Sequence, residues 1–298
     1  MLKKIRYYLR ILPSIQKRLA EIEESLTYLK QSVGRVENRQ TSKHTSTSLK
    51  NSEFKVYSQW GEDGIIQALL QSVQIEKKTF IEFGVQDYRE SNTRFLLVNN
   101  NWSGLVIDGG EHYINFIKKD PIYWRYNIKA VKAFINVGNI NDLILKNGME
   151  GEIGILSVDI DGNDYWVWEA IDVVSPAIVI SEYNSRFGPE KAVTVPYSQD
   201  FVRSEVHYSM IYYGASLKAL CLLAERKNYA FVGCNSAGNN AFFVRKDLKP
   251  SHLPELTAEE GYVAGQFRES RNKQGDLSFL SMKEEMEILE SLPLVEVS

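Results

Sequence analysis

The sequence predicts an α/β protein with a doubly wound, mostly parallel sheet, preceded by an N-terminal helical coiled coil. Between residues 54 and 250, short apolar runs typical of buried strands alternate with helical patterns. Two further strand patterns, 229–235 and 240–248, end this region as a hairpin. The coiled coil is predicted by apolar residues that recur at alternating spacings of three and four within the first forty residues.

These apolar residues form a heptad stripe made of Leu12, Ile15, Leu19, Ile22, Leu26, Leu29, Val33 and Val36. So narrow a stripe favours self-association over a single amphipathic helix that packs on the rest of the chain. Arg18 and Glu23 occupy g and e positions, which can pair between parallel helices. We therefore expect residues 1–36 to make a homo-oligomer, and the mixture of leucine at a with isoleucine at d favours more than two strands.

The segments on either side of the stripe differ from it in composition. The start of the chain, "MLKKIRYYLRIL", alternates basic with apolar and aromatic residues, so it either lies on an anionic membrane surface or extends the helix. Residues 37–53 contain almost no apolar side chain and are predicted to be a polar linker. The α/β domain then spans 54–250, and a helical extension over 251–298, with helices at 258–271 and 282–292, packs on it.

Composition and charge exclude several classes of protein. The net charge of −3 in 298 residues argues against broad binding of nucleic acid. Cys221 and Cys234 have no metal-ligand spacing, which is typical of reduced thiols in a cytosolic protein. No run of eighteen apolar residues is present, and the basic N-terminus lacks the features of a signal peptide. We expect a cytoplasmic protein, with peripheral contact at the inner face of the membrane as an open alternative.

Within the domain, strands and helices are expected in strict alternation. Glu62 and Asp63 stand in the first turn of the first helix, where the helix dipole favours acids. The expected strands are 78–85, 103–110, 131–137, 152–161 and 176–184, and the expected helices are 62–73, 92–100, 111–120, 139–148, 165–171 and 215–228.

All five strands are followed by polar residues. Ligands of doubly wound sheets bind at the carboxyl ends of the strands, so this shared edge predicts a site. In strand order, the candidates at this edge are Glu82, Gly84 and Gln86, then Asp108, then Asn136 and Asn139, then Asp159 and Asp161, and last Glu182 and Asn184.

The loop after the first strand indicates which cofactor the edge can take. A dinucleotide site requires a glycine-rich loop for the pyrophosphate, but Gln86 and Tyr88 stand where two of the glycines would be. This disfavours a nicotinamide-dependent oxidoreductase. Asp108 ends the second strand, where an acid accepts hydrogen bonds from ribose hydroxyls. A nucleoside without phosphate that carries an amino acid cation fits these residues, and S-adenosylmethionine is such a molecule.

The segments "YSQWGEDGII", "FIEFGVQDYRESNT", "WSGLVIDG", "LSVDIDGNDYWVW" and "FGP" resemble class I S-adenosylmethionine-dependent methyltransferases. The resemblance covers about residues 54–250 and is closest to the FkbM-like branch of polysaccharide, glycolipid and antibiotic pathways. It implies a seven-stranded sheet whose last strand is antiparallel. It also implies that Glu82 and Gly84 line the methionine moiety, with Gln59 and Trp60 over its amino-acid end and Gln86 in the same cofactor-binding set. Asp108 would hold the ribose, Asn136 or Asn139 would lie near the adenine, and Asp159 would close the site beside the sulfonium.

The stretch "DIDGNDYW" at 159–166 begins like a calcium-binding loop. An EF-hand loop needs glycine at position six and glutamate at position twelve, whereas here the glycine is at four and Ala170 is at twelve. Two interpretations remain. Either Asp159, Asp161 and Glu182 hold Mg²⁺ or Mn²⁺ that binds two sugar hydroxyls, or no metal is present and Asp161 or Glu182 is a general base, with His207 as a further candidate. Asn184 is expected to face the acceptor, and Asp164 to cap the next helix.

The hypothesis that follows is an O-methyltransferase acting on a sugar hydroxyl of a surface glycan or its precursor. The alternative is a non-catalytic, methyltransferase-like scaffold in glycan assembly, oligomerised by its coiled coil.

Overall fold

A computed structural model describes residues 2–41 and 48–298, with the backbone alone for residues 2–10. Its centre is a seven-stranded sheet in the order β3-β2-β1-β4-β5-β8-β7. Strand β8 is antiparallel to both of its neighbours, and the other pairs are parallel. The predicted fold class, the Rossmann-like methyltransferase fold, is therefore confirmed, including the antiparallel last strand. The strands are β1 (Thr79–Phe83), β2 (Ser103–Asp108), β3 (Ile128–Lys132), β4 (Gly151–Val158), β5 (Val174–Glu182), β7 (Tyr229–Cys234) and β8 (Asn240–Arg245).

Helices cover both faces of this sheet because each face is apolar. Along β1, Phe80 faces one core and Ile81 the other, as the alternation of a strand requires. The core that contains Ile81 also holds Trp168, and the core that contains Phe80 holds Tyr88. The helices are α2 (Glu62–Ser72), α3 (Arg94–Asn100), α4 (Glu111–Lys119), α5 (Ile122–Arg125), α6 (Ile140–Lys146), α7 (Asp164–Ala170), α8 (Arg203–Val206) and α9 (Leu217–Arg226), with a 3-10 helix η2 (Ser185–Phe187) after β5.

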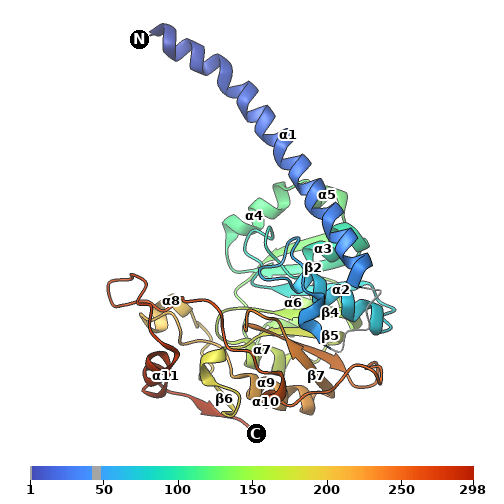
Figure 1. Ribbon diagram of the computed structural model, residues 1–298, viewed down its shortest axis with the longest axis vertical. Coiled ribbons are helices and arrows are strands. Elements are labelled where there is room, and N and C mark those ends of the chain that lie inside the picture. The colour runs from blue at the N-terminus through green and yellow to red at the C-terminus, as the bar shows by residue number, and fades with distance from the viewer. Residues whose placement is uncertain (1, 42–47) are drawn as a thin grey trace.

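The N-terminal helix α1 (Leu2–Thr41) extends away from this body (Figure 1). It runs five residues past the predicted boundary at 36, so the start of the predicted linker is helical. A short 3-10 helix, η1 (Leu49–Ser52), leads into the domain. The linker residues between 42 and 47, and the side chains of the basic segment up to residue 10, lie outside the described residues. No helix in the described part of the chain is both long and apolar enough to span a membrane.

Strand β3 begins and ends earlier than the apolar pattern predicts. It covers residues 128–132, not 131–137. The chain then turns, because the Asn139 side chain accepts a hydrogen bond from the Asn136 N–H at 2.9 Å and donates one to the Phe134 carbonyl at 2.8 Å. This shift changes which residues stand at the edge of the sheet.

The C-terminal extension also differs from its prediction. Only α10 (Ala258–Gly261) is helical within the range 258–271, followed by α11 (Met282–Glu290) and by β9 (Val295–Glu296), which pairs with β6 (Val193–Thr194). The chain leaves the helix after Gly261 because the body binds its backbone. The Tyr183 hydroxyl donates to the Val263 carbonyl at 2.6 Å, and the Gln266 N–H donates to the Ala237 carbonyl at 2.9 Å. Residues 262–281, here called the strap, therefore cross the carboxyl edge of the sheet as irregular chain.

Candidate functional site

Gly84 fixes the distance between the ends of β1 and β4. Its φ is +68°, and a Cβ built on it would lie 1.7 Å from the carbonyl oxygen of Asp159. The close approach that requires glycine here is thus to the neighbouring strand end, while Gly84 also lines the pockets beside it. Any side chain at 84 would push Asp159 away from the site.

In the loop after β1, two residues other than glycine adopt the left-handed backbone conformation that glycine favours. Gln86 has φ of +46° and Tyr88 has φ of +62°, in the left-handed region that glycine favours. The Tyr88 side chain is fully buried, and its hydroxyl hydrogen-bonds the Thr93 hydroxyl at 2.9 Å. Gln86 is exposed and lies between the pockets on this edge. Two residues with side chains therefore hold the left-handed backbone conformation at this turn.

Asp108 lies at the end of β2 as predicted. One carboxylate oxygen accepts the Gln86 N–H and the other accepts the Gly110 N–H, both at 2.7 Å. It borders a pocket between β1, β2 and β4, together with Gly84, Gln86, Tyr113, Phe134, Ile135, Asp159, Asp161, Asn163 and Phe201. Asn136 and Asn139 do not line this pocket but bond each other in the turn that presents Phe134 and Ile135 to it.

Glu82 has a structural role that the sequence did not show. Its carboxylate accepts hydrogen bonds from the backbone N–H groups of Asn92 and Thr93 and from the hydroxyl of Ser91. Burial raises its pKa, and these hydrogen bonds oppose the rise. Glu82 lines a pocket with Gln59 and Gly84, and its side chain holds the loop at 91–93 against the end of β1.

Three predicted acids come together beside Gly84. Asp159 and Asp161 follow β4, Glu182 ends β5, and one oxygen of each lies within 4.8 Å of the others. The Glu182 Oε2 atom is buried and has no hydrogen-bond partner among the described residues. Burial raises the pKa of Asp159 well above its usual range, and the charges of Asp161 and Asp164 raise it further. Burial and then the charge of Asp159 do the same to Glu182. The cluster therefore favours binding a proton or a cation.

The donor set fits a hard divalent ion. Carboxylate oxygens are the ligands that Mg²⁺ and Mn²⁺ prefer, and the unpartnered Glu182 oxygen would gain a partner. Asp161 already gives one oxygen to Arg203, at 2.6 Å, so its second oxygen is the one available. Asp159, Asp161 and Glu182 could hold such an ion, and the same atoms could instead share a proton.

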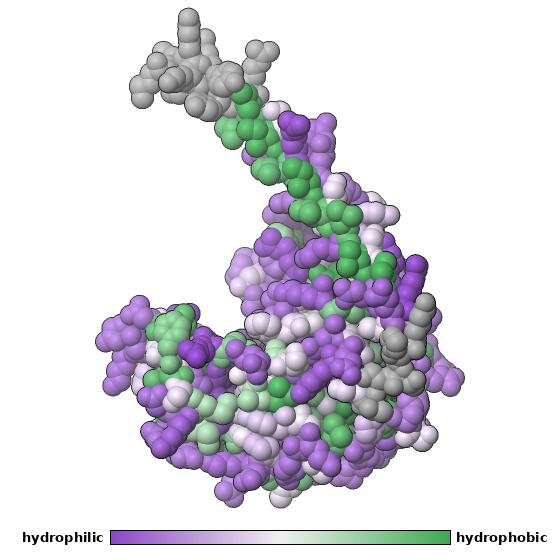
Figure 2. All heavy atoms as spheres, in the orientation of Figure 1, coloured by the Kyte–Doolittle hydropathy of each residue, from purple (hydrophilic) through white to green (hydrophobic). Residues whose placement is uncertain are grey.

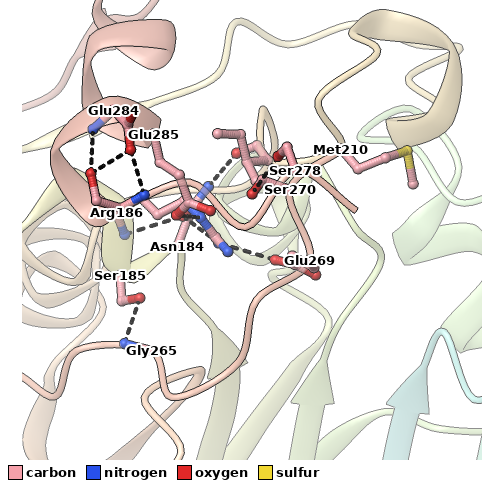
Figure 3. A network of polar contacts seen from close by, with 12 residues as sticks. Asn184, Ser185, Arg186, Met210, Gly265, Glu269, Ser270, Ser278, Glu284 and Glu285 are labelled. Atoms are coloured by element: carbon pink, nitrogen blue, oxygen red, sulfur yellow. Dashed lines mark hydrogen bonds and ion pairs between the residues drawn. The ribbon is translucent and has the colours of Figure 1, made fainter. Parts of the chain in front are cut away.

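Arg203 connects this acidic cluster to the strap. Its second terminal nitrogen lies 2.6 Å from Glu269, and its guanidinium stacks over the Tyr213 ring, 3.7 Å from the centroid. Glu269 also accepts a hydrogen bond from the Tyr213 hydroxyl at 3.2 Å and pairs with Arg186 at 3.0 Å. Arg186 in turn pairs with Glu285 of α11 at 2.7 Å (Figure 3). A chain of charges thus fixes one wall of the site from the C-terminal extension.

The strap closes a second pocket over the acids. Phe267 stacks on Trp60, with ring centroids 5.8 Å apart and planes at 12°. The residues around this pocket are Gln59, Trp60, Gly84, Gln86, Asp159, Asp161, Glu182, Arg203, Asn239, Phe267 and Glu269. The sequence prediction missed Arg203, Phe267 and Glu269, since no strand end precedes them and no motif contains them.

Asn184 and His207 lie elsewhere than expected. Asn184 is fully buried, and its amide donates to the carbonyls of Ile211 and Tyr213 and accepts from the N–H of Arg186, so it caps η2 and holds the chain of the insertion. His207 hydrogen-bonds the Ser209 hydroxyl through Nδ1 at 2.6 Å, and burial lowers its pKa. Neither residue is among those that line the two pockets.

Asp164 accepts hydrogen bonds from the Ile160 and Gly162 N–H groups, so it fixes the acidic loop at the start of α7.

No protein-family model and no curated protein sequence matches the chain. Among solved structures, one match is the N-terminal domain of EvdMO1 with SAH bound, at 13% identity and a TM-score of 0.41 over 61% of this chain and 79% of that one. An O-methyltransferase from Bacillus cereus in complex with SAH matches at 11% identity and a TM-score of 0.40 over 72% and 88%. The carbon methyltransferase of CurJ matches at 7% identity and a TM-score of 0.40 over 62% and 54%. These scores are too low for the neighbours' activities to bear on this chain.

Proposed function

We propose that this chain is an S-adenosylmethionine-dependent O-methyltransferase. One observation carries the proposal. The pocket bordered by Asp108 and the pocket over the acids share Gly84, Gln86, Asp159 and Asp161, so a nucleoside held at Asp108 would place its far end beside the three carboxylates. Asp108 can accept hydrogen bonds from a ribose, and the neighbouring cavity is acidic and partly covered. This pair of pockets suits a cofactor that has a nucleoside at one end and positive charge at the other.

The residues of the Asp108 pocket fit such a cofactor. The two backbone N–H groups that Asp108 accepts fix its carboxylate at the pocket mouth, where it can accept further hydrogen bonds from ribose hydroxyls. Phe134 is 49% exposed in this pocket and offers a flat apolar surface for an adenine. When bound, S-adenosylmethionine would supply a methyl group on a positively charged sulfur. The carboxylates of the cluster would stabilise that charge.

Glu182 is the proposed general base. Glu182 lines the pocket over the acids, and one of its oxygens belongs to the acidic cluster. There it could accept the proton of an acceptor hydroxyl while the methyl group would pass from the cofactor sulfur to the hydroxyl oxygen. The raised pKa of Glu182, caused first by burial, strengthens it as a proton acceptor once it is ionised. Arg203 would orient Asp161 beside Glu182 through the ion pair between Arg203 and Asp161.

The unpartnered Glu182 oxygen also favours a second form of the site, in which the three acids hold Mg²⁺ or Mn²⁺. The ion would lower the pKa of a bound hydroxyl, as metal ions do for bound water. In that form Asp159, Asp161 and Glu182 would be ligands, and the proton of the acidified hydroxyl would pass to water instead of to Glu182.

The acceptor we propose is a sugar hydroxyl of a surface glycan or its precursor. The pocket over the acids combines the Trp60–Phe267 pair with the polar side chains of Gln59 and Asn239, a lining that suits a polyhydroxylated molecule. The resemblance to the FkbM-like branch supports the same acceptor class.

Calorimetric titration with S-adenosylmethionine, S-adenosylhomocysteine and NAD tests the cofactor. We expect the first two to bind and NAD not to bind. In Asp108→Asn the affinity for both should fall about 10- to 100-fold, because a charged hydrogen bond to ribose contributes about 1.5–3 kcal/mol. Binding of NAD alone would exclude a methyltransferase, and no binding at all would favour the scaffold alternative.

Glu182→Gln tests the chemistry separately from binding. Cofactor affinity should stay within about twofold, while methyl transfer to glycan-precursor sugars falls by about 10²–10⁴.

Manganese binding to the protein alone, followed by electron paramagnetic resonance, distinguishes the two forms of the site. A saturable signal that Glu182→Gln and Asp159→Asn both weaken supports the metal form, and its absence leaves the general base. Full transfer activity in Glu182→Gln would refute both roles of this residue.

A further inference from the structure

Helix α1 keeps its apolar face away from the domain to which it belongs. In heptad notation Leu12, Leu19, Leu26 and Val33 are a positions, and Ile15, Ile22, Leu29 and Val36 are d positions; these eight residues are the α1 stripe. Their exposed fractions range from 47% at Ile15 to 57% at Leu29. Figure 2 shows a green band of apolar side chains along the projecting helix.

The helix contacts the domain through its opposite side. Gln31 donates to the Tyr57 hydroxyl at 2.7 Å, and Asn38 donates to the Gln67 side chain at 3.1 Å. Gly34 is buried, and a Cβ on it would lie 2.4 Å from Val56. These residues are f, f and b positions, which lie across the helix from a and d. Even where the helix is docked, Val33 and Val36 therefore remain 55% and 49% exposed. For the described side chains of the stripe, from Leu12 to Val36, the interpretation as an amphipathic helix packed on the body through its apolar face is wrong.

Between residues 12 and 30 every side chain of α1 is exposed. Most helical stability in proteins comes from packing of an apolar face, and the domain buries no side chain of this stretch. A continuous exposed apolar band on a soluble protein marks an interaction surface. The band runs past the docked segment without a change of spacing, so one partner helix could cover all of it.

We propose that the occupant of the α1 stripe is α1 of another copy of this chain, in parallel. A two-in-seven stripe is too narrow for a membrane-surface helix, which needs a broad apolar face. Aliphatic residues at every a and d position make the stripe complementary to itself in register. Arg18 at g and Glu23 at e give opposite charges that meet between parallel helices. Because each domain sits on the outer b and f side, two copies can join without displacing either domain.

Sedimentation velocity of the full chain over a micromolar concentration range tests the proposal. The wild type should sediment as a homo-oligomer, and Leu19→Lys with Leu26→Lys should sediment as a monomer throughout, since charge at a positions would be buried in the coil. The matched control places the same two lysines on the outer face, as Glu24→Lys with Thr27→Lys, and should keep the wild-type mass. Thermal unfolding of the α/β domain should be the same in all three proteins, which shows that the variants fold.

A monomeric wild type would overturn the proposal, whether or not it binds anionic vesicles, and so would a stripe variant that keeps the wild-type mass. Orientation has its own test. In a parallel coil Leu12→Cys meets its own copy and should cross-link on oxidation, while Lys17→Cys on the outer face should not. Equal cross-linking of the two variants, or none in Leu12→Cys, would refute the parallel arrangement.

Discussion

At the scale of single residues, Gly84 sets the position of the acidic cluster because its backbone lies against that of Asp159. Its φ of +68° and the 1.7 Å that would separate a Cβ at this position from the Asp159 carbonyl oxygen leave no room for a side chain. The sequence indicated a glycine at this turn, but only the pairing of β1 with β4 shows what it approaches.

Gly84→Ala should therefore lower the free energy of unfolding by at least about 2 kcal/mol, the combined cost of a left-handed alanine and of displacing Asp159. Chemical denaturation measures this. Gly109→Ala is the matched control at the same edge, because its Cβ would meet only Phe134, at 3.7 Å. We expect the control to lie within about 0.5 kcal/mol of the wild type. Equal stability of the two variants would show that the turn relaxes.

The sequence predicts the residues of the site that end a strand, but not the residues that come from the insertion or the strap. Asp108, Asp159, Asp161 and Glu182 are fixed by local pattern, because parallel strands end at one edge. Arg203 and Glu269 reach the same edge through an insertion and through the strap, and only long-range contacts bring them there.

At the scale of elements, misplaced boundaries explain the misplaced residues. The predicted third strand begins three residues too late, which places Asn136 at the edge where Phe134 and Ile135 lie. Periodicity locates a strand but fixes its ends poorly, since side-chain hydrogen bonds such as that of Asn139 to Phe134 decide where the chain turns. The predicted helix over 258–271 failed for a related reason: its helical composition is overridden by backbone bonds to Tyr183 and Ala237.

The strap should be held mainly by Glu269. This carboxylate pairs with both Arg203 and Arg186, which are only 14% and 5% exposed, so its loss removes one of the two ion pairs that each arginine makes among the described residues. Glu269→Gln should cost about 1–3 kcal/mol of unfolding free energy, because each arginine keeps its second carboxylate and Glu269 itself is 27% exposed.

The control for this prediction lies in the same extension. Glu290 pairs with Lys191, but both are about half exposed, at 54% and 46%, so Glu290→Gln should cost less than about 0.5 kcal/mol. Thermal unfolding of both variants against the wild type measures the difference. If Glu269→Gln were as stable as Glu290→Gln, the strap would be held by its apolar contacts instead.

At the scale of the whole molecule, the carboxyl edge of the sheet concentrates buried and half-buried acids. Glu82, Asp159, Asp164 and Glu182 all lie there, and burial is the largest cause of the raised pKa of each. Neutral or cation-bound forms of these groups favour the folded state. Ionisation of the acids at this edge, which would bind the ligand, therefore lowers the free energy of unfolding.

Asp164 allows this relation to be measured without replacing Asp159, Asp161 or Glu182. Burial raises its pKa from 3.8 to about 6, against the opposing hydrogen bonds from the Ile160 and Gly162 N–H groups. Between these values the folded state holds a proton that the unfolded state has lost. The stability that Asp164 contributes therefore falls as pH rises from about 4 to about 6, by a total of about 3 kcal/mol for a shift of this size.

The amide that Asp164→Asn introduces cannot titrate. The unfolding free energy of the variant minus that of the wild type should therefore rise steadily from pH 4 to pH 6 and then level off. The hydrogen bonds lost by the amide lower stability by a constant amount and do not affect this slope. Urea denaturation at several pH values measures it, with Asp276→Asn, a change at an exposed side chain, as the control. A constant difference between Asp164→Asn and the wild type across this range would mean that Asp164 is already ionised in the fold at pH 4, and that its two backbone hydrogen bonds outweigh its burial.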